Sequence, residues 1–326
     1  MSDYKPPFDL TSKIVNLSIE ISEQAGRMAA LEEPAHLIML RKENRIRTIH
    51  SSLSIEGNTL SAGQVTALLD GKRVSGSERE IREVQNAGRA YGKITELSPY
   101  SIDDLLVAHS LMMDGLIQDS GRFRQGGVGI FRGGMPVHIA PPAHLVPFQI
   151  RDLMDWHESE AIHPLIKSAV FHYEFEYIHP FSDGNGRMGR FWHSLLLGSW
   201  KEIFYHLPVE EQIRERQAQY YEALGKADEL GNSTPFVEFM LEVTKETLLS
   251  LPEPGWKPQQ EAPFRLYEAL GNEELSAVQL MDKLGLRHRP TFRENYLKPA
   301  LEKGLIEMTI PDKPSSKLQK YRRKKS

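Results

Sequence analysis

The stretch HPFSDGNGRMGR, residues 179–190, is the feature that most limits how this chain can fold. It gathers a histidine, an aspartate and two arginines around three glycines, between two segments with helical apolar spacing. Pro180 ends the first segment, because the residue before a proline is kept out of the α region. Glycines adopt positive φ angles, at which successive backbone N–H groups can surround an anion. The sequence therefore predicts a tight helix–loop–helix unit with charged side chains at its loop.

The residue types in this loop suit a polyphosphate and its metal ion. We expect Arg187 to open the second helix, with Arg190 on the same face three residues later. Forked guanidinium donors match phosphate oxygens, and a helix N-terminus adds partial positive charge. Asp183 is a natural ligand for a phosphate-bound Mg²⁺. His179 is the best general base near neutral pH. The loop by itself predicts a phosphate-transfer site.

Outside the loop, most of the chain has helical apolar spacing. A glycine-rich segment interrupts this helical pattern. Within it, short β-prone stretches around Val128–Ile130 and Val137–Ile139 predict a small hairpin. The fold class that follows is mainly α. The helices that we predict cover residues 13–30, 34–50, 61–70, 78–96, 102–117, 145–158, 164–178, 208–228 and 233–250.

Composition narrows the class of protein. The hydrophobic share of 40% and the charged share of 26% are typical of a soluble globular chain. No apolar run approaches the ~20 residues needed to span a bilayer, and the first residues lack the order of a signal peptide. The absence of cysteine excludes disulfides and thiolate metal sites. We therefore expect a cytoplasmic protein with no membrane partner.

The C-terminal end has a different charge from the rest. Residues 286–326 contain twelve lysines or arginines and four acidic residues. They follow a proline-rich segment, SLPEPGWKPQQEAP, which we interpret as a linker. The stretch LSAVQLMDKLGL and the helix expected near 290–303 resemble a winged helix. Such a basic unit suits DNA, and the alternatives are protein docking or a basic surface that is merely solvated; the sequence leaves these open.

The loop motif resembles the signature of the Fic family. Residues 179–190 match every fixed position of His-Pro-Phe-x-(Asp/Glu)-Gly-Asn-Gly-Arg-x-x-Arg, and the likeness extends over about residues 45–250. The resemblance implies a Fic-type helical core with a hairpin flap. It also implies an adenylyltransferase that moves AMP from ATP to Ser, Thr or Tyr hydroxyls of proteins, itself included, and releases pyrophosphate.

The resemblance assigns a role to each matched residue. His179 becomes the catalytic base, and Asp183 the ligand of Mg²⁺ or Mn²⁺. The ATP phosphates are assigned to Gly184, Asn185, Gly186, Arg187 and Arg190. The adenine pocket is assigned to Ile130, Tyr220, Tyr221, Leu224 and Asp228, although Asp228 stands where relatives often have asparagine. The 121–139 hairpin, as the flap, is expected to bind the target protein by strand addition.

A second element resembles the inhibitory helix of the same family. SSLSIEGN matches Ser/Thr-x-x-x-Glu-Gly/Asn, with Ser52, Glu56 and Gly57 at the fixed positions. The resemblance implies that Glu56 pairs with Arg190 and fills the space that the γ-phosphate needs. A carboxylate near two arginines mimics phosphate charge. In some relatives the same glutamate serves removal of AMP, and the sequence does not choose between the two roles.

These features predict an N-terminal helical region at 1–97 with its inhibitory helix at about 45–57, and a catalytic core at 98–250. A linker at 251–263 and a winged-helix-like domain at 264–326 would follow. Three alternatives to AMP transfer stay open. They are phosphoryl or other nucleotidyl transfer, AMP removal that depends on Glu56, and DNA-binding regulation with a dormant core. Family habit also suggests a homodimer.

Overall fold

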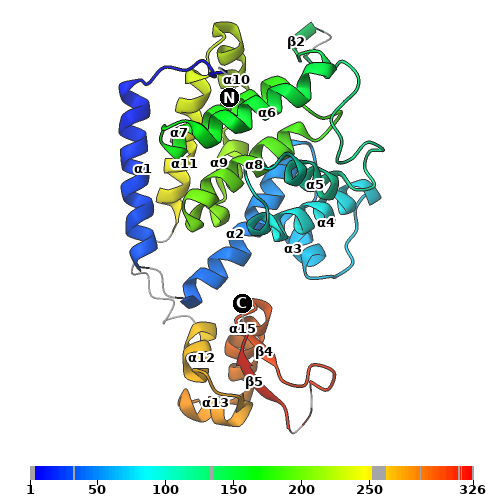
Figure 1. Cartoon of the computed structure of the whole chain (residues 1–326). Coiled ribbons are helices and arrows are strands. Elements are labelled where there is room, and N and C mark those ends of the chain that lie inside the picture. Colours follow the sequence, from blue (N-terminus) through cyan, green and yellow to red (C-terminus); the bar gives the residue numbers. More distant parts are fainter. Residues whose placement is uncertain are drawn as a thin grey trace. The chain divides into compact units, whose positions relative to one another are not determined.

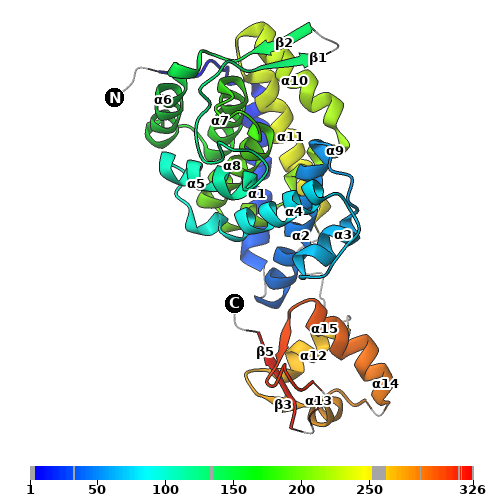
Figure 2. The ribbon, with the colours of Figure 1, turned by 90° about the vertical axis from the view of Figure 1, so that its right-hand side faces the viewer.

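The computed structural model describes residues 4–31, 34–132, 135–251, 262–286, 288–314, 316 and 318–324. Within these, the side chains of residues 29–40 and 130–138 lie outside the description. The chain divides into two compact units (Figures 1 and 2). The first comprises Met1–Gly26 and Asn44–Leu251, and the second comprises Arg27–Glu43 and Pro252–Ser326. The boundaries that the sequence suggests inside the first unit stay predictions, and residues 252–261 of the expected linker lie outside the described residues.

Helices build the chain up to residue 251, so the mainly α fold class is confirmed. The helix expected at 208–228 is divided at Arg216. The α-helices are α1 (Ser12–Leu31), α2 (Pro34–Ile55), α3 (Ala62–Leu69), α4 (Glu78–Gly92), α5 (Ile102–Met113), α6 (Val146–Ser159), α7 (Pro164–Ile178), α8 (Asn185–Trp200), α9 (Val209–Glu215), α10 (Gln217–Leu230) and α11 (Thr234–Ser250). Short 3₁₀ turns lie at Ile94–Glu96, Ala143–Leu145 and Glu202–His206.

The central helix of the first unit is α7, which packs against α6, α8 and α11 (Figures 1 and 2). Every residue from Leu165 to Glu176 is buried, so no polar stripe faces solvent along this helix. A helix that is buried all round belongs to the middle of a core. The neighbouring α8 is buried from Arg187 to Gly198. The motif loop therefore joins the two most enclosed helices, and their packing fixes both of its ends.

The predicted hairpin is present as β1 (Gly129–Arg132) and β2 (Met135–Ile139), paired antiparallel. Gly129 pairs with Ile139, and the register shifts between Ile130 and Phe131. Such a bulge bends a two-stranded ribbon and increases its twist.

The second unit combines short helices with a three-stranded antiparallel sheet in the order β3–β5–β4. The helix expected at 290–303 runs from 289 to 302 and contains a π-helical turn at Phe292–Leu297. Pro299 follows that turn and has no N–H for the carbonyl of residue 295, which favours the irregularity. The elements are α12 (Ala262–Leu270), β3 (Leu275–Ser276), α13 (Ala277–Lys283), α14 (Arg289–Thr291), α15 (Lys298–Glu302), β4 (Ile306–Met308) and β5 (Lys320–Arg323).

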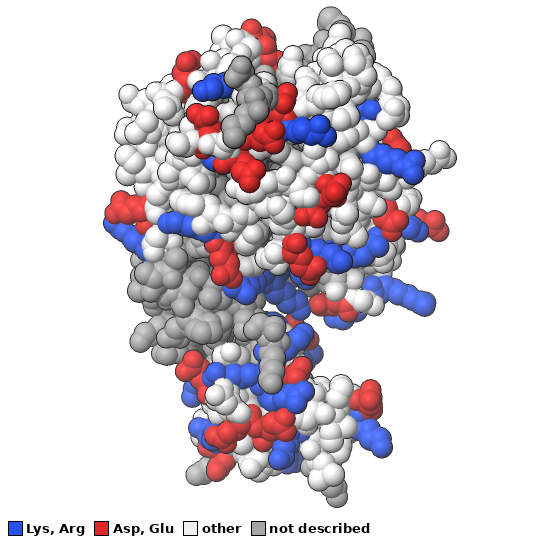
Figure 3. All heavy atoms as spheres, viewed as in Figure 1, with Lys and Arg blue, Asp and Glu red and all other residues white. Residues whose placement is uncertain are grey.

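Basic side chains of the second unit are largely interspersed with acidic ones on the face shown in Figure 3. Arg322 contacts Glu307 at 2.7 Å and Glu274 at 3.1 Å, and Lys298 lies 3.6 Å from Glu294. These pairs neutralise part of the positive charge that the sequence shows. Among the described residues, no helix combines the length and the apolar character that a membrane crossing requires.

Glu210 gives the first unit a titratable group in its core. Its Oε1 accepts hydrogen bonds from Tyr91 at 3.2 Å and Ser194 at 3.3 Å, and the residue is 1% exposed. Burial raises the pKa of Glu210 to about 7, against a smaller opposing effect of its hydrogen bonds and of Arg190. The folded chain therefore holds a proton here that the unfolded chain releases near pH 4.5.

Stability should consequently fall as pH rises through this window, and Glu210→Gln should remove that dependence. We expect the difference in unfolding free energy between Glu210→Gln and wild type to shift in favour of the variant by up to about 3 kcal/mol as the pH rises from about 4.5 to 8. Urea unfolding across this range measures it, with the exposed Glu229→Gln as a control that shows no such trend. A constant difference between Glu210→Gln and wild type would contradict the assignment.

Candidate active site

His179 lies at the point where α7 ends and the motif loop begins. Its backbone has φ 50° and ψ 62°, and among the described residues it alone is a non-glycine with positive φ. The left-handed conformation costs roughly 1–2 kcal/mol for an L-residue. The His179 N–H still donates to the carbonyl of Phe175 at 3.0 Å. The chain thus leaves the helix in one residue, and the surrounding structure has to hold that conformation.

The ring of His179 has a defined partner on one side. Its Nδ1 lies 3.2 Å from the carbonyl oxygen of Glu176. A carbonyl oxygen can only accept, so Nδ1 carries the proton in the neutral ring. The remaining nitrogen, Nε2, then has a free lone pair, which a general base needs.

His109 of α5 packs against the motif loop. Its ring stacks on Phe181 with centroids 3.6 Å apart, and its Nε2 lies 3.0 Å from the carbonyl oxygen of Asp183. The N–H of Gly121 donates to Nδ1 at 2.9 Å, so Nε2 carries the proton. Burial lowers the pKa of His109 to about 4, which keeps the ring neutral.

The N-terminus of α8 lies where the sequence analysis expects the loop to bind phosphate. The helix begins at Asn185, so the prediction that Arg187 opens it is wrong by two residues. Gly184 is the N-cap of α8, with φ 85°. This positive φ lets the chain turn at Gly184, so the helix starts two residues earlier than expected. The first N–H groups of a helix lack intrahelical acceptors, and the helix dipole favours negative charge there.

Asn185 uses its side chain within the loop. Its Oδ1 accepts from the N–H of Phe181, and its Nδ2 donates to the carbonyl of the same residue, both at 2.9 Å. In this structure the Asn185 side chain closes the motif loop back on itself. The predicted contact of Asn185 with phosphate stays a prediction.

Arg190 is buried and is bound by the end of α2. Its Nε donates to Ser52 Oγ at 3.1 Å, and Nη2 donates to Ser52 O at 3.0 Å and to Glu56 Oε1 at 2.8 Å. Burial opposes the charged form, but Glu56 together with Tyr220 and Glu176 outweighs it, so the pKa of Arg190 is raised. α2 ends at Ile55, and Glu56 and then Gly57, at φ 90°, form the turn that follows it. The structure therefore brings Arg190 together with Ser52 and Glu56, which lie 138 and 134 residues away from it in the sequence.

The Glu56 carboxylate also lies against the first turn of α8. A Cβ added at Gly186 would stand 2.6 Å from Glu56 Oε1 and 3.1 Å from Arg190 Nη1. Only glycine permits so close an approach of a carboxylate to this helix N-terminus. Glu56 thus occupies the position that the dipole and the arginine make attractive to an anion.

Arg187 and Asp183 have partners that the sequence analysis missed. Arg187 lies 3.5 Å from Glu83 Oε1 and 3.3 Å from Asp183 Oδ1, and Asp183 Oδ2 lies 3.5 Å from Arg79. Asn58, two residues after Glu56, donates to Glu83 at 2.9 Å. Both arginines of the motif are therefore paired with carboxylates in this structure. The only sequence signal was the acidic first half of α4, EREIRE, which by itself indicates a solvated helix start.

The residues assigned to adenine lie in different surroundings. Tyr220 is 2% exposed and its hydroxyl lies 3.2 Å from His172 Nε2, so its ring is part of the core. Tyr221 is exposed and Leu224 is half-buried. Asp228 accepts a hydrogen bond from Tyr173 at 2.8 Å. The side chain of Ile130 lies outside the described residues. Within the described part of the adenine set, Tyr221 is thus the exposed side chain, Leu224 and Asp228 are half-buried, and Tyr220 is buried.

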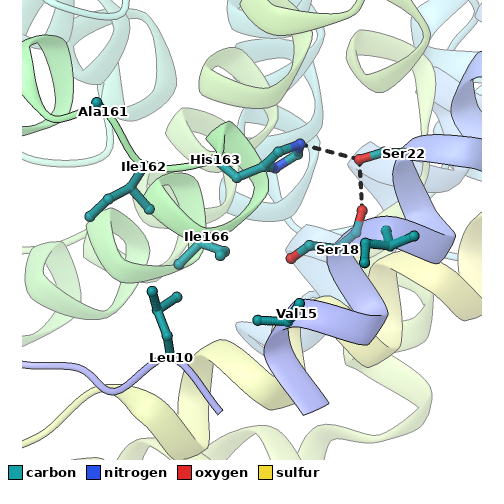
Figure 4. A pocket seen from close by; sticks show the side chains of 9 residues that line it. Leu10, Val15, Ser18, Ser22, Ala161, Ile162, His163 and Ile166 are labelled. Carbon is teal, nitrogen blue, oxygen red and sulfur yellow. Dashed lines mark hydrogen bonds between the residues drawn. The ribbon is translucent and has the colours of Figure 1, made fainter. Parts of the chain in front are cut away.

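A pocket of about 510 Å³ lies away from the motif loop, between the N-terminal segment with α1 and the start of α7 (Figure 4). Its walls are mostly apolar. The polar contact at its edge is between Ser22 and His163, at 3.2 Å (Figure 4). Its lining residues are Leu10, Val15, Ser18, Ile19, Ser22, Ala161, Ile162, His163 and Ile166. None of the residues assigned to catalysis or to the ATP phosphates lines this pocket.

Two segments of the chain match models of known protein families. A model described as Fic/DOC family matches residues 99–197. A model described as Filamentation induced by cAMP protein Fic-like, C-terminal domain, matches residues 264–323. The first match contains the motif loop, α7 and most of α8.

Solved and curated proteins show the same likeness. A Fic family protein from Desulfovibrio desulfuricans G20 is 50% identical, with a TM-score of 0.72 and 99% of each chain covered. Protein adenylyltransferase fic-1 of Caenorhabditis elegans is 32% identical over 64% of this chain and 42% of its own length. Protein adenylyltransferase Fic of Drosophila erecta is 30% identical over 79% of this chain and 52% of its own length. This chain thus spans about half the length of the curated relatives that it matches.

Proposed function

This chain belongs to the Fic family, and from that membership and the geometry of its motif loop we propose that it is a protein adenylyltransferase. It would move AMP from ATP to a hydroxyl of a target protein and release pyrophosphate. The observation that carries the proposal is the start of α8, in the loop that His179 opens, where the Glu56 carboxylate lies against Gly186 and pairs with Arg190. The Glu56 carboxylate that lies in this site marks where phosphate charge would bind.

The reaction follows from the charges around the loop. His179 Nε2 accepts the proton of the target hydroxyl as that oxygen bonds to the α-phosphorus. The bond from the α-phosphorus to the bridging oxygen breaks, and the electron pair leaves with pyrophosphate. Arg187 and Arg190 face the charge that develops on this leaving group, and the α8 N-terminus stabilises the oxygens of the transferred phosphate.

Asp183 fits a Mg²⁺ that ATP brings with it. Among the described residues no group of three metal-ligating side chains exists. Mg²⁺ bound with nucleotide commonly takes one or two carboxylates, and its other ligands are phosphate oxygens and water. The half-exposed Asp183 side chain meets that requirement, provided that Arg79 and Arg187 release it. The ion would neutralise phosphate charge during transfer; Mn²⁺ has the same preference for oxygen ligands.

Label transfer tests the reaction itself. We expect Glu56→Gly, incubated with Mg²⁺ and ATP labelled at the α-phosphate, to label protein, whereas ATP labelled at the γ-phosphate leaves protein unlabelled. The free product should be pyrophosphate. Label from the γ-position alone would instead establish phosphoryl transfer. Loss of label from pre-modified protein, dependent on Glu56, would establish AMP removal as the main activity.

A second role for the C-terminal unit rests on its exposed basic residues. We propose that residues 264–326 form a winged-helix-like module, in which Arg289, Arg293 and Lys298 are exposed along one helical run. Salt-sensitive, sequence-specific binding of duplex DNA by the full chain would make this a DNA-reading module. Binding that is absent or independent of sequence would leave protein docking, for which the interspersed charges of the unit are suited (Figure 3).

A further inference from the structure

The side chain of Arg124 is buried beneath the motif loop. The residue is 2% exposed, and its guanidinium donates to four backbone carbonyls. Nε donates to His179 at 2.7 Å, and Nη2 donates to Ile178 at 3.2 Å and to Pro141 at 2.6 Å. Nη1 donates to Gly126 at 2.9 Å. The backbone N–H of Arg124 adds a fifth bond, to Pro180 at 3.0 Å.

These carbonyls belong to two functional elements. Ile178 and His179 are the last residue and the C-cap of α7, where carbonyls lack intrahelical donors and the helix dipole is negative. Gly126 precedes β1, and Pro141 follows β2, so both lie at the base of the hairpin. One side chain therefore holds the end of the catalytic helix and the base of the hairpin together.

Arg124 is bound by carbonyls rather than by an acid. Within the described part of the chain, no carboxylate lies within ion-pairing distance of it. The helix end and the peptide dipoles therefore compensate its charge. Arginine suits this place because five N–H donors spread in a plane can reach four separate acceptors. A lysine ammonium has three donors at one point and cannot reach both elements in the same geometry.

We propose that Arg124 is the positioning residue of the proposed AMP transfer. It holds His179 in its left-handed conformation, and it holds the hairpin base at a fixed place relative to His179. The inference rests on the proposed function, in which His179 receives the proton of the target hydroxyl, and on the expectation from the family resemblance that the hairpin binds the target. A target hydroxyl is in reach of Nε2 only if the hairpin and the histidine keep one relative position. Arg124 is the side chain that bonds to both.

Kinetics in the Glu56→Gly background test this role. We expect Arg124→Met to lower kcat about 10²-fold, as a displacement of about 1 Å does at a catalytic site. The affinity for ATP should stay within about twofold, because the anion site is built from α8 and its arginines. Arg124→Lys keeps a buried cation and should fold, yet lose most of the same activity. Arg122→Met, an exposed arginine two residues away, is the matched control and should behave as the parent.

The outcomes separate positioning from general stability. If kcat and ATP affinity fell equally, and in proportion to a fall in melting temperature, Arg124 would contribute only to the stability of the fold. Full activity of folded Arg124→Lys or Arg124→Met would also overturn the proposal. If Arg124→Met does not fold, Arg124→Lys alone decides.

A second measurement does not depend on enzyme activity. In chains with ¹³C-labelled histidine, the Cδ2 shift of His179, assigned through His179→Ala, reports which ring nitrogen carries the proton. We expect the Nδ1–H form in the parent and a mixture of both forms in Arg124→Met. An unchanged shift would contradict the proposal. If no variant transfers label but the shift changes, the proposed function fails and the positioning role stands.

Discussion

Glu56→Gly is expected to raise the rate of AMP transfer about 10²-fold over the wild type. The Glu56 carboxylate binds Arg190 at 2.8 Å and lies against Gly186 at the start of α8. The carboxylate therefore already occupies both Arg190 and the start of α8 when ATP arrives. Removing one aligned donor from a developing anion typically costs a factor of about 10²–10³ in rate, and restoring it should return a similar factor. The measurement is the initial rate of α-label incorporation at saturating ATP.

The matched variant is Glu56→Gln, which keeps the size of the side chain and removes its charge. We expect it to be activated less than Glu56→Gly, because the amide still fills space but no longer pairs with Arg190. Ser52→Ala should activate little, since it removes one neutral acceptor of Arg190 and leaves the carboxylate in place. Equal activity of wild type and Glu56→Gly at every ATP concentration would contradict the inhibitory role.

His179→Ala is expected to reduce transfer by a factor of about 10²–10⁴ when introduced into the Glu56→Gly chain. The loss has a single cause, because the general base is removed while the anion site on α8 stays intact. ATP affinity should accordingly change little, and the target hydroxyl should lose its proton acceptor. Initial rates and ATP binding, measured on the same preparations, separate these two effects.

His144→Ala serves as the control for this variant, because His144 is exposed and lies in the 3₁₀ turn after the hairpin. Its rate should equal that of the Glu56→Gly parent. Retention of more than about a tenth of the parent rate by His179→Ala would show that proton removal by His179 is not part of the rate-limiting step.

The sequence predicted the parts of the fold that depend on local signals. The helix before Pro180, the glycine-rich loop and the small hairpin each have a pattern within about twenty residues, and each is present in the structure. The start of α8 was placed two residues late, because sequence alone did not show that Gly184 would act as the cap. Boundaries of this kind depend on backbone angles more than on side-chain pattern.

The supports of the site could not be predicted in the same way. Arg124 binds carbonyls that are 54 and 55 residues away, and Glu83 reaches Arg187 from another helix. These contacts arise from how α4, α5, α7 and α8 pack, and no periodicity marks them. The pairing of Glu56 with Arg190 was expected only through resemblance to a family motif. Even there, the sequence could not show that Gly186 makes room for the carboxylate.

Binding of AMP, ADP and ATP to the wild type and to Glu56→Gly, measured by calorimetry in Mg²⁺, tests the central claim most directly. The claim is that the start of α8 is a phosphate site which Glu56 occupies. We predict that the substitution changes AMP affinity little and improves ATP affinity most, with ADP between them, because only the outer phosphates compete with the carboxylate. The same gain for all three nucleotides, or none for ATP, would contradict the claim.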